Sequence, residues 1–233
     1  MTTKLTIDPH PLLDLGAFVT AWPEPLGKME SPQWLADLAR LDAPTPFEPP
    51  DEKVKKSVRD LLRHGGFKPN GRSKPCCEYI RAVAAKGLFP NINVAVDATN
   101  LAALHGALPV STIDLDLIRG RRATEPVGPG VNREIEEPLR VGIAQKGMRY
   151  VFNASGQEID LSGLLCLFDV VGPCANSVKD SQRAKTTEES RRTLTIIWGT
   201  QALPRRAGQL VDWHMELNTK LGGTVEKVEM QLY

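Results

Sequence analysis

The sequence contains none of the common short motifs of catalysis or nucleotide binding. It has no Gly-x-Ser-x-Gly nucleophile turn, no Gly-Lys-Ser/Thr phosphate loop, no Gly-x-Gly-x-x-Gly turn and no His-Glu-x-x-His helix. These motifs place a nucleophile, a phosphate, a dinucleotide and a zinc ion, respectively. Their absence excludes the familiar forms of the serine hydrolases, P-loop nucleotidases, Rossmann dehydrogenases and zinc proteases.

Cysteine and histidine are scarce and scattered. No two cysteines have the Cys-x-x-Cys spacing of a zinc site, and the histidines lie far apart in the sequence. We therefore expect no bound metal, no cofactor and no disulfide framework. The residues concerned are Cys76, Cys77, Cys166, Cys174, His10, His64, His105 and His214.

Charge of one sign and long apolar runs are also missing. Lysine and arginine number 29 against 28 acidic residues, so the formal net charge is +1 and any contact with nucleic acid depends on local clusters. The longest apolar stretch, residues 164–171, is far shorter than the ~20 residues that cross a bilayer. Residues 1–20 show no secretion signal. We expect a cytoplasmic protein without membrane or DNA partners.

The patterns that are present predict one domain over residues 1–233. Short strands are expected at 4–7 and 17–21, a helix from Pro32 and a proline-rich linker at 43–50. Apolar residues at helical spacing predict three helices between residues 51 and 106. The part from 107 to 233 is rich in strand patterns, at 112–117, 138–145, 148–153, 157–171 and 193–198, with a helix opening at Pro204. Runs of helices followed by runs of strands predict an α+β fold, with a helical region packed on a mixed or antiparallel β-rich half.

Two segments carry a resemblance to a known family. Residues 71–80 read Gly-Arg-Ser-Lys-Pro-Cys-Cys-Glu-Tyr-Ile, and residues 92–100 read Ile-Asn-Val-Ala-Val-Asp-Ala-Thr-Asn. They resemble the editing domain of the phenylalanyl-tRNA synthetase beta subunit, which has a proline-entered helix followed by an Ile-Asn-Asn-Val-Val-Asp-Val-Thr-Asn run. Residues 184–198 are similar to that family's turn and strand further along, so the resemblance covers nearly the whole chain.

The resemblance implies an α+β domain with a pocket for an aminoacyl group carried on tRNA. A freestanding relative would hydrolyse the ester of a mischarged tRNA and would have no aminoacylation activity. Such hydrolysis needs a positioned water and donors to the developing oxyanion. Thr99, Asn100 and Ser111 match the positions that would hold the carbonyl or the water. The alternative is that the first two bond backbone groups in their own helix.

The sequence departs from the family pattern at two of these positions. Ser111 stands where the family has a histidine, and Ile196 falls near the glutamate that reads the tyrosine hydroxyl. An apolar side chain cannot form a hydrogen bond with the hydroxyl of tyrosine, so selection of tyrosine is not expected. Asp97 and Asp114 match family acids and would contact substrate, or else cap helices and fix turns. Cys174 either faces the pocket or is a buried, inert thiol.

Basic residues mark candidate tRNA contacts. Arg183 and Lys185 lie in the shared motif and are expected near the acceptor end, and Arg121 and Arg122 form a second cluster. Phosphate contacts favour these residue types but carry no sequence specificity. Further candidates are Arg119, Lys179, Arg191, Arg192, Arg205 and Arg206.

Three functional interpretations stay open. The first is a trans-acting aminoacyl-tRNA deacylase, and the second is a non-catalytic module that binds a tRNA end or an amino acid. The third is an enzyme that uses the same pocket for another acylated small molecule, since fold does not fix function. The sequence identifies neither the amino acid, the tRNA nor the oligomeric state.

Overall fold

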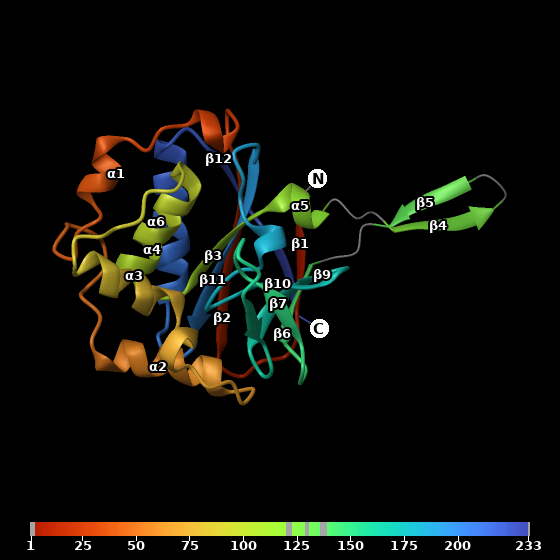
Figure 1. Ribbon diagram of the computed structural model, residues 1–233, viewed down its shortest axis with the longest axis horizontal. Helices are drawn as coiled ribbons and strands as arrows, with labels where there is room; N and C mark the ends of the chain where they lie inside the picture. Colours follow the sequence, from red (N-terminus) through yellow and green to blue (C-terminus); the bar gives the residue numbers. More distant parts are fainter. Residues whose placement is uncertain (1–2, 120–122, 129–130, 136–138, 233) are drawn as a thin grey trace.

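The computed structural model describes residues 3–119, 123–128, 131–135 and 139–232, and it shows an α+β fold with two main sheets. Figure 1 shows the helices on one side and the sheets beside them. The five-stranded sheet has the order β10 (Gly172–Asn176), β9 (Leu165–Asp169), β6 (Leu139–Ile143), β1 (Lys4–Ile7), β13 (Glu229–Leu232). The four-stranded sheet has the order β12 (Thr224–Lys227), β2 (Leu13–Ala21), β11 (Arg192–Thr200), β3 (Val110–Asp114).

Four further strands form two separate antiparallel pairs. β7 (Arg149–Val151) pairs with β8 (Glu158–Asp160), and β4 (Ala123–Gly128) pairs with β5 (Val131–Ile135). Figure 1 draws the β4–β5 pair apart from the two larger sheets. Residues of both main sheets contribute to one hydrophobic cluster, so the sheets share a core.

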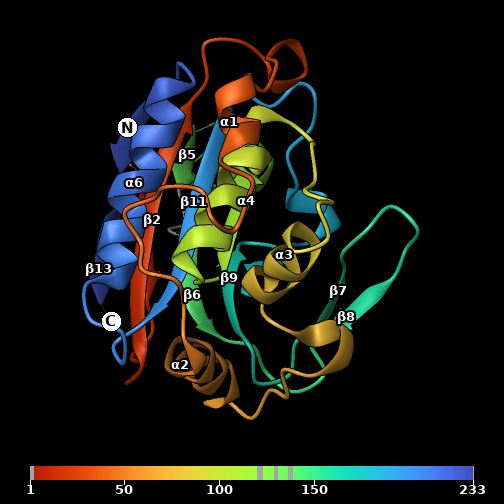
Figure 2. The same cartoon turned by 90° about the vertical axis from the view of Figure 1, so that its left-hand side faces the viewer.

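The helices are α1 (Gln33–Asp37), α2 (Glu52–Arg63), α3 (Cys76–Ala84), α4 (Val94–Gly106), α5 (Leu115–Arg119) and α6 (Arg206–Lys220). Figure 2 shows α1, α3, α4 and α6 in front of the strands. The three helices expected between residues 51 and 106 are confirmed as α2, α3 and α4.

Helices α2 and α4 show how the sequence determines position. In α2, Asp51 caps the first turn by accepting from the Val54 N–H at 2.9 Å, and one stripe of aliphatic side chains is buried. Almost every residue of α4 is buried, and Asn93 caps its start at 3.0 Å from the Val96 N–H. A helix that is apolar on all sides belongs inside the protein, and α4 accordingly packs between α3, α6 and β3.

The ladder around β11 fixes which side chains meet. β11 pairs antiparallel with β2 and with β3, so Thr195 lies opposite Thr112 and Ile196 opposite Ser111. Because successive side chains of a strand point to opposite faces, Thr112 and Ser111 face different sides of this sheet. The Thr112 hydroxyl lies 2.5 Å from that of Thr99 in α4, so the threonine side is the helix side.

One strand prediction was wrong. The alternation at residues 112–117 predicts a strand, but β3 ends at Asp114 and α5 begins at Leu115. The Asp114 carboxylate accepts from the N–H groups of Asp116 at 2.8 Å and Leu117 at 3.1 Å. This side chain therefore caps a helical turn. Such hydrogen bonds from a side chain to the backbone compete with strand pairing, and the alternation of residue types does not reveal them.

Two glycines bring α2 close to the β7–β8 hairpin. A Cβ on Gly65 would meet the Gly163 carbonyl oxygen at 2.3 Å, and a Cβ on Gly163 would meet the Gly65 oxygen at 2.2 Å. Gly163 also has φ of +75°, where a side chain is strained. The two backbones touch because neither residue has a side chain. No helix in the part of the chain described above is long and apolar enough to span a membrane.

The buried His214 makes stability depend on pH. Its ring is fully buried against Phe18, and neither nitrogen has a hydrogen-bond partner in the described structure. Burial lowers the pKa of His214 from 6.5 to about 3. Below pH 6.5 the His214 ring is protonated in the unfolded chain but stays neutral in the folded protein. The free energy of unfolding therefore falls as the pH falls from about 6.5 toward 3.

We expect His214→Phe to weaken this pH dependence. Between pH 6.5 and 5 the wild type should lose about 1.6 kcal/mol through this one histidine, because the slope approaches about 1.4 kcal/mol per pH unit only below pH 6.5. Urea unfolding at both pH values measures the loss for the wild type and the variant. An equal loss in both proteins would show that His214 is not responsible.

Candidate functional site

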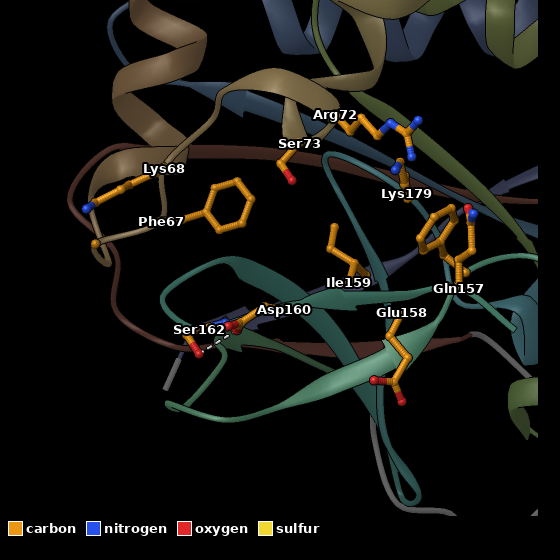
Figure 3. Close-up of a pocket in the computed structure, with 12 residues that line it drawn as sticks. Phe67, Lys68, Arg72, Ser73, Gln157, Glu158, Ile159, Asp160, Ser162 and Lys179 are labelled. Atoms are coloured by element: carbon orange, nitrogen blue, oxygen red, sulfur yellow. Dashed lines mark hydrogen bonds between the residues drawn. The ribbon is translucent and has the colours of Figure 1, made fainter.

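A cavity of about 610 Å³ lies between the segment after α2 and the β7–β8 hairpin. Figure 3 shows Phe67, Arg72 and Ser73 on one wall and Ile159 and Asp160 on the other. The backbones of Gly65 and Gly163 touch where the two walls meet, and this contact holds the walls together at one side of the cavity. The lining residues are Gly66, Phe67, Lys68, Arg72, Ser73, Phe152, Gln157, Glu158, Ile159, Asp160, Ser162 and Lys179.

The centre of the cavity is apolar with one hydroxyl. In Figure 3 the Phe67 ring and the Ile159 side chain point toward the centre, and the Ser73 hydroxyl points between them. Phe67 and Ile159 are both anchored in the core, at 8% and 5% exposure. Phe67, Phe152 and Ile159 supply the apolar surface of the cavity, and the other side chains that line it are polar or charged.

Positive charge gathers at one end of the cavity. Arg72 and Lys179 line it together (Figure 3), and the Lys179 ammonium lies 4.0 Å from the centre of the Phe152 ring. Lys185 donates to the Phe152 carbonyl oxygen at 2.6 Å. Among the residues described, no carboxylate lies within ion-pair distance of these three cations. Desolvation, then the charges of Arg72 and Lys185, lower the pKa of Lys179. A bound anion would relieve this repulsion.

The turn at residues 176–180 connects the cavity to a buried polar network. Asn176 is 1% exposed, and its side-chain oxygen accepts from the N–H groups of Val178 at 2.7 Å and Lys179 at 2.9 Å. Its amide nitrogen donates to the Tyr150 hydroxyl, which in turn donates to the Lys179 carbonyl oxygen at 2.5 Å. This turn directs Lys179 to the cavity and places Asp180 near Ser111.

Ser111 and Asp180 form the most chemically distinctive pair of this network. The Ser111 hydroxyl accepts from the Trp198 indole N–H at 3.0 Å. It donates to the Asn176 carbonyl oxygen at 3.0 Å, and the Asn176 N–H in turn donates to the Asp180 carboxylate at 3.2 Å. Burial raises the pKa of Asp180 to about 7, although the Ser111 hydroxyl and the Asn176 N–H act in the opposite direction. A carboxyl with this pKa can exchange protons at neutral pH.

The residues assigned by resemblance do not all meet at one place. Thr99 lies on the helix side of the four-stranded sheet, where its hydroxyl donates to the Ala95 carbonyl oxygen at 2.8 Å. Ser111 lies on the opposite side, because Thr112 rather than Ser111 contacts Thr99. Asn100 is partly buried in α4. None of these three residues lines the cavity between Phe67 and Ile159. Their catalytic roles stay predictions.

The two expected acidic residues have local structural partners. Asp97 is buried and accepts from the Ser31 hydroxyl at 2.5 Å and the Ile92 N–H at 2.8 Å, so it fixes the entry to α4. Asp114 caps α5 and also accepts from the Ser190 hydroxyl. Both carboxylates therefore act at the ends of helices.

Ile196 and Cys174 are both fully buried. Ile196 lies opposite Ser111 in the ladder, on the Ser111 side of the sheet. Cys174 donates to the Leu167 carbonyl oxygen at 3.4 Å, and burial raises its pKa well above the usual range. Cys174 is therefore not a thiolate at neutral pH.

The basic candidates divide into three groups. Arg183 makes a bidentate ion pair with Asp169, at 2.7 and 2.8 Å, and holds the β9–β10 turn. Lys185 lies beside the cavity through its bond to Phe152. Arg121 and Arg122 fall outside the side chains that the structure describes.

The sequence alone did not identify the cavity. Phe67, Phe152, Ile159 and Asp160 come from loops and a hairpin with no motif, and Asp180 directly precedes the basic motif. The one sequence signal for this region was the basic group Lys179, Arg183 and Lys185. Lys179 lines the cavity, and Lys185 donates to the carbonyl oxygen of the lining residue Phe152. No group of three metal-ligating side chains occurs within the described ranges.

A second cavity, of about 340 Å³, lies between α2 and α3. Two of its lining acids have cationic partners: Glu78 accepts from Arg59 at 2.6 Å, and Glu52 lies 3.3 Å from Lys55. Because its charges are neutralised locally, it offers less to a charged ligand than the first cavity.

Comparison with solved structures finds the same overall arrangement in a crystal structure of an N-terminal fragment of the phenylalanyl-tRNA synthetase beta subunit from Pyrococcus horikoshii. The TM-score is 0.51 at 9% sequence identity. The two chains share a fold. The match covers 100% of this chain and 52% of the fragment, so this chain spans about half the fragment's length. No family model and no curated protein matches the sequence.

We expect Ser111→Ala to raise the pKa of Asp180 above about 7, because the hydroxyl stabilises the ionised carboxylate. Carbon-13 NMR of the labelled aspartate carboxyls, titrated in the wild type and the variant, measures the change. The Asp169 resonance serves as an internal control, because its partner Arg183 is unchanged. An unchanged or lowered Asp180 pKa would show that Ser111 does not act on it.

Proposed function

We propose that this protein binds the acceptor end of a tRNA in the cavity between Phe67 and Ile159. The observation that carries the proposal is the group of cations Arg72, Lys179 and Lys185, which gather at one end of the cavity without an ion-pair partner among the described residues. A single-stranded RNA end offers phosphates for such cations and base faces for aromatic rings. The fold shared with a tRNA synthetase fragment supports the same ligand class.

The near-neutral charge of the whole chain is compatible with this proposal. With a net charge of +1, the protein has no general attraction for polyanions. Local convergence of three cations at one cavity favours a ligand whose phosphates enter that cavity. A short single-stranded terminus satisfies this condition better than a duplex, which the cavity would not admit.

Replacing both Arg72 and Lys179 by alanine should weaken tRNA binding by roughly tenfold or more, since a charge-assisted hydrogen bond contributes about 1.5–3 kcal/mol. The slope of log affinity against log salt should fall by about 0.7 for each lost phosphate contact. Fluorescence anisotropy with an uncharged tRNA, over a salt series, measures both quantities.

The matched control is Lys56→Ala with Lys227→Ala, which removes the same charge from two exposed lysines. They lie near Asp60 and Asp212, at 2.7 and 3.8 Å, rather than at the cavity. Equal loss of affinity in both double variants would contradict the proposal, because the effect would then come from net charge alone.

Hydrolysis of an aminoacyl ester is the second candidate function. It is favoured by Asp180, whose pKa of about 7 suits a general base and which lies beside Ser111, a residue that the family resemblance assigns to the site. In this reaction Asp180 takes a proton from water, and the oxygen of that water attacks the ester carbonyl. The bond to the ribose oxygen then breaks, the ribose hydroxyl regains a proton, and the amino acid leaves as a carboxylate.

A deacylase predicts release of amino acid at substoichiometric protein from one of a panel of mischarged tRNAs. Asp180→Asn should lower the rate by roughly 10²–10⁴, the range of a general base, while leaving tRNA affinity nearly unchanged. Asn100→Ala in the same assay tests the role implied by family resemblance. Binding without release from any charged tRNA would contradict hydrolysis and leave the binding function in place.

A further inference from the structure

One short turn carries a lysine of the cavity and, directly after it, a carboxylate that does not line the cavity. The lysine is Lys179, and the carboxylate is that of Asp180. The Asn176 side chain accepts from the Lys179 N–H at 2.9 Å, and the Asn176 N–H donates to the Asp180 carboxylate at 3.2 Å. The same asparagine therefore fixes both charges, with the ammonium group at the cavity and the carboxylate in the polar network beside Ser111.

Asp180 has no counter-ion in contact with it. Within the described part of the chain, no lysine or arginine lies within ion-pair distance of its carboxylate. The cation that acts on it is Lys185, whose charge favours the ionised carboxylate at longer range. Lys185 also donates to the carbonyl oxygen of the lining residue Phe152 at 2.6 Å. One ammonium group therefore acts on Asp180 and on the cavity together.

The other titratable groups that face Asp180 are neutral near pH 7. They come from α3, β7, β9 and β10, and burial is the largest cause that raises the pKa of each of them. The Ser111 hydroxyl of β3 favours the ionised form of Asp180 and does not titrate in this range. Burial raises the pKa of Asp180 itself to about 7, so its proton is the one that can move here near neutral pH. The neutral groups are the thiols of Cys76, Cys166 and Cys174 and the phenol of Tyr150.

A phosphate bound beside Lys179 would be a second negative charge close to this turn. It would repel the ionised Asp180 carboxylate and would draw on the same lysine charges. Binding of an anion therefore favours the neutral form of Asp180. By linkage, a proton on Asp180 strengthens binding of the anion by the same factor.

We infer that binding of an RNA phosphate at Arg72, Lys179 and Lys185 is coupled to the uptake of a proton by Asp180. This inference rests on the proposed binding of a tRNA acceptor end and assigns a control by pH to that same site. In the free protein at alkaline pH, ionised Asp180 is the countercharge of the cations. In the complex the phosphate takes this part, and Asp180 becomes neutral. Affinity therefore rises as the pH falls from about 8 to about 6, through the pKa of Asp180.

The experiment is calorimetric titration of the protein with uncharged tRNA at pH 6, 7 and 8, at constant ionic strength. Repeating each titration in buffers of different ionisation enthalpy gives the number of protons taken up. The wild type should take up a fraction of a proton, with a maximum near pH 7. It should bind roughly threefold more tightly at pH 6 than at pH 8, as expected for repulsion between two charges separated by one turn.

Asp180→Asn should abolish the maximum near pH 7 and give the same affinity at pH 6 and pH 8. The change of roughly threefold is small beside the loss of rate that hydrolysis would show. Protons taken up by Lys179 or by a histidine would persist in this variant. The matched control is Asp212→Asn, which removes an exposed carboxylate 3.8 Å from Lys227 and should keep the uptake.

Ser111→Ala gives a second measurement that does not alter Asp180 itself. Because the hydroxyl favours the ionised carboxylate, its loss should move the maximum of proton uptake to higher pH. Binding without proton uptake near pH 7, or equal uptake in the wild type and Asp180→Asn, would overturn the inference while leaving tRNA binding established. A folded wild type that binds no tRNA at any of the three pH values would instead overturn the proposed function.

Discussion

The side chain of Asn176 is the constraint on which both parts of the site depend. Its amide oxygen folds residues 176–179 into a turn, and its amide nitrogen ties that turn to Tyr150. Its own backbone carbonyl meets the Ser111 hydroxyl on β3. One buried amide thus joins strands from different parts of the chain. Lys179 then faces the cavity and Asp180 lies beside Ser111. A buried polar group with every bond satisfied fixes a unique geometry in this way.

The site works by separating charges within a nearly neutral protein. Arg72, Lys179 and Lys185 gather at one end of the cavity, and no carboxylate of the described structure lies within ion-pair distance of them. Repulsion among these cations costs free energy and would be relieved by a bound anion. Strong general attraction to RNA is not needed for such a local contact.

Sequence patterns predicted the fold well and the site only in part. Helical spacing located α2, α3 and α4, since their buried faces repeat along the chain. The position of β3 in its sheet was not predictable from spacing, and this position separates Thr99 from Ser111. The cavity escaped prediction because its walls come from segments about 90 residues apart, residues 66–73 and 157–162, joined by the contact of two glycines. Long-range backbone contacts of this kind leave no periodic signal in the sequence.

The most direct test of the central claim is to observe the cavity itself during binding. Protein labelled with carbon-13 in the isoleucine methyl groups is titrated with a single-stranded oligonucleotide that has the terminal sequence of tRNA. Ile159 lines the cavity, while Ile80 is buried in a separate cluster among the helices. The account predicts a saturable shift of the Ile159 methyl signal with little change at Ile80. Saturable binding that leaves Ile159 unchanged would place the ligand elsewhere and contradict the account.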